Sequence, residues 1–196
     1  MFTISNLVTQ IGDLAVLLPL AIATAILLYI SKNRQAAMYF AVIFTSCLAT
    51  MGLLKFFFLS CGGRFRIGIE SPSGHAAAST MVLGSICLIA CFQVSGFVRM
   101  LIAAVTVSLI AAIAVSRVVL GAHSVNEVIA GTVTGMFFLA LFAAAYARVP
   151  QKPLRLTLLA GGIPLMLVAL YGSHLPIEVW LRRSVALISN NNHTCF

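Results

Sequence analysis

Two histidines and a carboxylate stand out in a chain that is almost free of charge. His123 and Glu127 are four residues apart, and His75 ends the segment Ser71-Pro72-Ser73-Gly74-His75. If a helix begins near His123, residues four apart lie on one face, so Glu127 can accept a hydrogen bond from one imidazole nitrogen. That bond fixes the tautomer and makes the other nitrogen a nucleophile. These residue types fit the transfer of a phosphoryl group.

The segment before His75 has the features of an anion site at the start of a helix. Ser73 can cap the helix, Pro72 suits its first turn, and Gly74 lets a phosphate approach the backbone closely. His75 would then stand where a general acid protonates a departing oxygen. The structural alternative for His75 and His123 is that each lies at an ordinary capped helix start.

Cations that could bind phosphate lie near both histidines. Arg117 is six residues before His123, and its guanidinium fork matches phosphoryl oxygens. Lys55 interrupts an apolar run, and Arg64 and Arg66 follow it in a loop. The structural alternative for Arg117 and Lys55 is that they snorkel to the membrane interface.

The composition predicts an integral membrane protein built from helices. Of 196 residues, 61% are hydrophobic and only 8% are charged, whereas soluble domains carry about 25% charged residues. The net charge of +8 favours anionic lipid headgroups as partners over nucleic acid, because no basic run accompanies a soluble module. The first twelve residues contain no Lys or Arg, so the first apolar segment is expected to stay in the mature protein.

Six apolar stretches are long enough to cross a bilayer, which takes about 20 residues. The predicted fold is an all-α, polytopic membrane bundle in a single domain, residues 1–196. Gly131 and Gly135 form a GxxxG pattern, which favours close packing within the bundle over a homodimer face. Residues 4–13 and the tail 173–196 are expected to lie along the interface. The predicted spans are 13–31, 37–59, 74–96, 98–117, 125–147 and 154–172.

The placement of charge predicts the orientation of this bundle. Six basic residues fall in loops on one side, whereas most cations on the other side belong to the candidate site. The positive-inside rule therefore places the site away from the cytoplasm, facing the periplasm or exterior of a bacterial inner membrane. Cys61 and Cys195 could pair in such a compartment, although the cysteines in apolar spans act as small hydrophobic residues.

In its motifs the chain resembles the type 2 phosphatidic acid phosphatase (PAP2) family of membrane lipid phosphatases. That family has three motifs: Lys, six residues, Arg-Pro; then Pro-Ser-Gly-His; then Ser-Arg, five residues, His, three residues, Asp. Here the second motif is Pro72–His75. The third reads Ser116-Arg117, five residues, His123, three residues, Glu127, with Glu in place of Asp. The resemblance covers residues 55–135.

The resemblance implies a mechanism that needs no metal and no cofactor. His123 would attack phosphorus to form a phosphohistidine, His75 would protonate the leaving group, and Glu127 would orient the nucleophile. The first motif is irregular, because Gly62 stands seven residues after Lys55 where Arg is expected. Arg64 is favoured as the arginine of that motif, and Arg66 is the alternative. The expected phosphate-binding residues are therefore Lys55, Arg64, Ser73, Gly74 and Arg117.

The predicted activity is hydrolysis of a lipid phosphate, either a phosphomonoester or a diphosphate, that reaches the site from the bilayer. Candidate substrates are undecaprenyl diphosphate, phosphatidylglycerol phosphate, phosphatidic acid and phosphorylated lipid A, with a polyprenyl carrier favoured for so small a chain. Two alternatives stay open: a lipid phosphotransferase that uses the same phosphohistidine, and a catalytically silent lipid-binding relative. The intact His75, Arg117, His123 and Glu127 argue against the silent relative.

Overall fold

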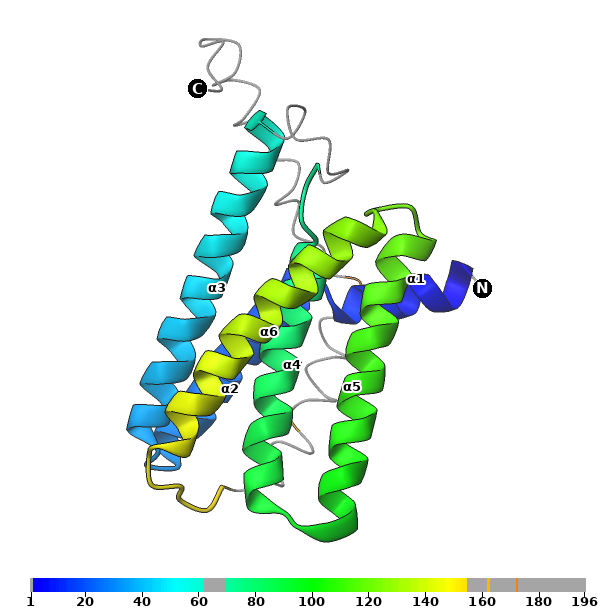
Figure 1. The fold of residues 1–196 in the computed structure, drawn as a ribbon. Helices are drawn as coiled ribbons and strands as arrows, with labels where there is room; N and C mark the ends of the chain where they lie inside the picture. The colour runs from blue at the N-terminus through cyan, green and yellow to red at the C-terminus, as the bar shows by residue number, and fades with distance from the viewer. Residues whose placement is uncertain (1, 62–69, 155–161, 163–171, 173–196) are drawn as a thin grey trace.

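The computed structural model describes residues 2–61 and 70–154, together with Gly162 and Gly172. These residues form helices and contain no strand. Figure 1 shows α2 to α6 gathered in a bundle, with α6 tilted across it and the short α1 lying across one end. The helices are α1 (Phe2–Ile11), α2 (Leu14–Ile30), α3 (Arg34–Cys61), α4 (Gly74–Gln93), α5 (Gly96–Val119) and α6 (Val125–Ala147).

Five segments of the described chain are long and apolar enough to cross a membrane. They confirm the polytopic, all-α class, and they correspond to the first five predicted spans. The predicted sixth span, 154–172, lies almost wholly outside the described residues and stays a prediction. The tail 173–196, predicted to lie along the interface, and Cys195, which could pair with Cys61, lie outside them too. The five segments are Ile4–Ile30, Arg34–Leu59, Gly74–Gln93, Gly96–Val119 and Val125–Ala147.

The first of these segments is broken between α1 and α2. A Cβ added at Gly12 would lie 2.5 Å from Ile113 Cγ2 of α5, so a glycine is needed for this close approach. Asp13 caps α2, and its Oδ1 accepts a hydrogen bond from Ala15 N at 2.9 Å. The chain therefore turns at this corner, and α1 crosses the bundle next to α5 (Figure 1). Its predicted position along the membrane interface stays a prediction.

α4 is the central helix, because neighbouring helices bury most of its surface. Many of its buried side chains are small, among them Ala76, Ala77 and Ser79, so other helices can come close. A Cβ added at Gly135 of α6 would lie 2.5 Å from Ala77 O, and one at Gly131 would collide with the Ser73 carbonyl. The GxxxG pattern of α6 therefore serves packing inside the bundle, as predicted.

The outward faces of the helices are apolar, whereas buried polar residues gather at one end. Val105 of α5 and Phe137 of α6 are each more than half exposed, at 58% and 59%. Such surfaces suit contact with lipid chains better than contact with water. The end where α1 crosses contains most of the buried polar side chains, namely Asp13, Ser71, Ser73, Ser116, His123 and Glu127.

Candidate active site

The candidate site forms where successive helices end and begin. Because α3 to α6 alternate in direction, the last turns of α3 pass the start of α4 and continue beyond it, and the end of α5 lies near the start of α6 (Figure 1). The residues predicted from the sequence come from these helix ends. Lys55 is on α3, His75 on α4, Arg117 on α5, His123 in the α5–α6 turn and Glu127 on α6.

His123 and Glu127 form the pair that their spacing predicts. His123 Nδ1 lies 3.0 Å from Glu127 Oε2, and both residues are buried, at 8% and 7% exposed. Ser124 caps α6 in a reciprocal capping box: its Oγ accepts from Glu127 N at 3.3 Å, and its own N donates to Glu127 Oε2 at 3.0 Å. The helix cap and the histidine pair therefore share one carboxylate oxygen, so the structural and functional interpretations are compatible.

The other oxygen of Glu127 ties the third motif to the second. Oε1 accepts hydrogen bonds from Glu70 N at 2.8 Å and Ser71 N at 2.6 Å. The main-chain carbonyl of Glu127 also accepts from Ser73 N at 3.0 Å. A buried carboxylate needs such donors to offset the loss of water. Glu127 is therefore fixed from both sides, by its own helix start and by the segment leading into α4.

The second motif begins α4 as the sequence predicts. Ser73 is its N-cap, with Oγ accepting from Ala76 N at 3.4 Å, and the side chain is fully buried. Lys55 lies against this segment: its Nζ donates to Ser71 Oγ at 3.3 Å, and its Cε would be 3.5 Å from a Cβ added at Gly74. The observed role of the Ser73 hydroxyl is capping. Phosphate binding by Ser73, Gly74 and Lys55 stays a prediction.

The corner between α1 and α2 supplies two contacts that sequence reasoning missed. His75 Nε2 lies 3.6 Å from Asp13 Oδ2, and Arg117 Nη1 donates to Thr9 Oγ1 at 2.9 Å. Lys55 and Arg117 are also close enough to His75 to act on it electrostatically. One clue was available, because Asp13 is one of only four acidic residues in the chain and stands between apolar helices.

A cavity of about 290 Å³ adjoins the histidine–carboxylate pair. This space is many times the roughly 10–15 Å³ that holds one water molecule, so it has room for a group of the size of a phosphoryl group. Lys55, His75 and Arg117 are not among its lining residues, and Arg64 and Arg66 lie outside the described residues. The lining consists of Glu70, Gly121, Ala122, His123, Ser124 and Glu127.

Comparison with known proteins finds the family that the second and third motifs resemble. The model of the PAP2 superfamily matches residues 59–151, a range that holds the second and third motifs and leaves out Lys55. Over 148 residues the chain is 31% identical to an uncharacterized 22.5 kDa protein in the cps region of Klebsiella pneumoniae, covering 74% of this chain and 71% of that protein. No solved structure matches. The chain therefore belongs to the PAP2 superfamily, whose members are generally phosphatases.

Proposed function

We propose that the protein hydrolyses the phosphate group of a membrane lipid through a phosphohistidine intermediate. The observation that carries this proposal is the 3.0 Å contact between His123 Nδ1 and Glu127 Oε2. Backbone N–H groups of Glu70, Ser71 and Ser124 hold the carboxylate in place. A fixed acceptor at Nδ1 keeps the proton on that nitrogen, so Nε2 is the nitrogen that attacks.

The proposed reaction has two steps. In the first, a bond forms between His123 Nε2 and phosphorus while the bond from phosphorus to the leaving oxygen breaks, and His75 gives that oxygen a proton. In the second, His75 takes a proton from a water molecule that attacks phosphorus, and the phosphorus–nitrogen bond breaks to release inorganic phosphate. Lys55 and Arg117 would stabilise the charge on the phosphoryl oxygens. No step requires a metal ion.

A lipid substrate fits the position of the site at the ends of apolar helices. The phosphate would stay at the end of the bundle while the hydrocarbon part remains among lipid chains. Cations cluster at the opposite end, and by the positive-inside rule that end faces the cytoplasm. The reaction would then take place on the periplasmic or outer side. The cations at the opposite end are Lys32, Arg34, Arg99, Arg148 and Lys152.

The first test is phosphate release by the purified protein in detergent, with a chelator present and no metal added. We expect release from at least one of four substrates: undecaprenyl diphosphate, phosphatidylglycerol phosphate, phosphatidic acid and phosphorylated lipid A. Activity that disappears with chelator and returns with a divalent ion would contradict the metal-independent mechanism. If no lipid releases phosphate but labelled phosphate passes to an acceptor lipid, the protein is a phosphotransferase instead.

Asp13→Asn tests whether the corner carboxylate assists His75. Asn is an equally good N-cap, so α2 keeps its start while the negative charge is lost. Two opposite charges about 4 Å apart attract by roughly 1–4 kcal/mol between bulk water and the protein surface, so we expect kcat on a lipid phosphate to fall about tenfold or more. A substrate with a good leaving group, such as p-nitrophenyl phosphate, needs less protonation and should lose less. Equal losses on both substrates would show that Asp13 does not act through His75.

A further inference from the structure

The end of the bundle opposite the candidate active site contains a separate cationic cavity. It has a volume of about 210 Å³ and lies between the α2–α3 turn, the start of α3 and the segment after α6. Its lining includes Lys32, Arg34 and Lys152, and no acidic residue is among the described residues that line it. The acidic residues of the described chain lie at the other end, with the candidate site, and they are Asp13, Glu70 and Glu127.

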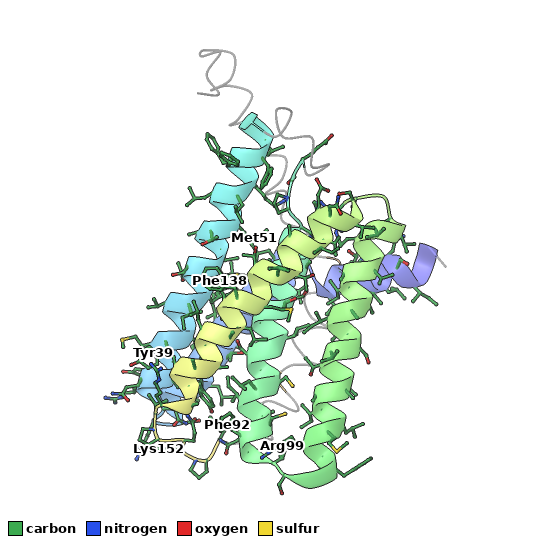
Figure 2. All side chains as sticks on the ribbon, in the orientation of Figure 1. Tyr39, Met51, Phe92, Arg99, Phe138 and Lys152 are labelled. Carbon is green, nitrogen blue, oxygen red and sulfur yellow. The ribbon has the colours of Figure 1, made fainter. Side chains whose placement is uncertain are left out.

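The buried Asn33 and the half-buried Gln93 hold the walls of this cavity in place. Asn33 is only 5% exposed, and its side chain pairs with the main chain of Lys152: Nδ2 donates to O at 3.2 Å, and Oδ1 accepts from N at 2.9 Å. Gln93 Oε1 accepts from Leu154 N at 3.3 Å. The segment after α6 is thereby fixed against the α2–α3 turn and the end of α4. Figure 2 shows Lys152 at this end of the bundle, together with Arg99.

The α2–α3 turn carries a lysine where the backbone favours another residue. Lys32 has φ 62°, and among the described residues it is the only non-glycine with a positive φ. A residue other than glycine in this left-handed region costs about 1–3 kcal/mol, whereas glycine adopts it readily. The chain therefore keeps a cation beside the cavity at a position where the turn itself does not favour one.

An apolar groove lies next to the cavity, between α2 and α3. Its volume is about 500 Å³. Arg34 lines both the cavity and the groove, and its guanidinium carbon lies 5.2 Å from the centre of the Tyr29 ring. A cationic cavity that joins an apolar groove matches a molecule with an anionic head and a hydrocarbon tail. The groove is lined by Ala25, Ile26, Tyr29, Arg34, Ala37 and Met38.

We propose that this end of the bundle binds one anionic phospholipid, with its phosphate in the cavity and an acyl chain along the groove. Lys32, Arg34 and Lys152 would provide the charge that attracts the phosphate. Ile26 and Met38 are 54% and 57% exposed, and they would provide apolar contact. In the orientation given above, the lipid belongs to the cytoplasmic leaflet, whose surface is negative. This site is separate from the substrate site and does not depend on the catalytic proposal.

The test is native mass spectrometry of the full-length protein in a neutral detergent, titrated with phosphatidylglycerol or with phosphatidylcholine of the same chains. We expect one phosphatidylglycerol per protein and no comparable binding of phosphatidylcholine. Lys32→Gln and Lys152→Gln should each weaken the apparent affinity about fivefold, because each removes about 1 kcal/mol of charge attraction at the bound phosphate itself. Arg99→Gln is the matched control. Arg99 lies at the same end but outside the cavity lining and donates to Val94 O, so its loss should change affinity by less than about twofold.

Three results would overturn the proposal. Equal losses in Lys32→Gln, Lys152→Gln and Arg99→Gln would show that diffuse charge, and no particular cavity, attracts the lipid. Equal binding of phosphatidylglycerol and phosphatidylcholine would show that the negative charge of the headgroup is not recognised. Complete displacement by inorganic phosphate, with no effect of acyl chain length, would assign the cavity to free phosphate. Thermal unfolding midpoints close to that of the unaltered protein would establish that the variants are folded.

Discussion

His123→Ala is expected to abolish phosphate release almost completely while the protein stays folded. The imidazole is the proposed nucleophile, and it is the side chain that lies 3.0 Å from Glu127 Oε2. Loss of a nucleophile that acts as a unit with its partners lowers kcat on the order of 10⁴-fold or more. Without the ring, Glu127 keeps its hydrogen bonds from Glu70 N, Ser71 N and Ser124 N, so the fold should be retained. The measurement is release from the best lipid substrate, with the unfolding midpoint measured in parallel.

His75→Ala is the matched comparison for this variant. It keeps the nucleophile and removes the acid, so a substrate with a good leaving group should still phosphorylate His123. Hydrolysis of the intermediate should then be slow, because the base for water is missing. An acid-labile phosphorus label should therefore accumulate on His75→Ala and be absent from His123→Ala. Residual activity of His123→Ala within about tenfold of the unaltered protein, a difference of about 1.4 kcal/mol in the barrier, would disprove the nucleophile.

Glu127→Gln is expected to lower activity nearly as far as His123→Ala does, because it moves the proton on the His123 ring. If the amide oxygen keeps the bonds from Glu70 N and Ser71 N, the amide NH₂ replaces Oε2. The NH₂ group then faces the N–H of Ser124 and donates a hydrogen bond to His123 Nδ1. The proton of the His123 ring therefore moves to Nε2. In a Ser-His-Asp triad the same change lowers kcat by roughly 10⁴. We expect a loss of about 10²–10⁴ in kcat, with little change in KM.

Glu127→Asp tests the charge of the carboxylate apart from the length of the side chain. Asp is the residue that the family motif has at this position, but its side chain is one methylene shorter. It can keep a negative charge near His123 while its contact with Ser71 N is stretched. We expect activity well above that of Glu127→Gln and an unfolding free energy lower by about 1–3 kcal/mol, the cost of a buried N–H group without a partner. Equal losses of activity in Glu127→Asp and Glu127→Gln would contradict the proposal that Glu127 acts by keeping the proton on His123 Nδ1.

The parts of the site that the sequence predicted depend on short-range spacing. The pairing of His123 with Glu127 follows from two residues four apart at a helix start, and the cap by Ser73 follows from residue type alone. The membrane spans follow from hydropathy over about 20 residues. The helix ends were harder to predict. α3 begins at Arg34 and α5 at Gly96, because helical hydrogen bonding continues beyond the apolar run.

The contacts missed from the sequence join distant segments. The contacts of Asp13 with His75 and of Thr9 with Arg117 form only because the chain turns at Gly12 and α1 crosses α5. α2, α4 and α6 are apolar on every side and carry no periodic pattern that indicates which face packs inward. The positions of these partners therefore depend on the packing of whole helices, and local sequence does not determine them.

The main chain itself joins the two segments that carry the histidines. Ser73 N donates to the carbonyl of Glu127, and Gly131 lies directly on the backbone of Ser73. These two backbone contacts do not involve the residues on the outer faces, such as Val133 and Phe137, which are both 59% exposed. Substitutions on the lipid-facing surface can therefore accumulate over many generations without altering the spacing of the reaction centre. The outer surface is free to adapt to membranes of different thickness and composition.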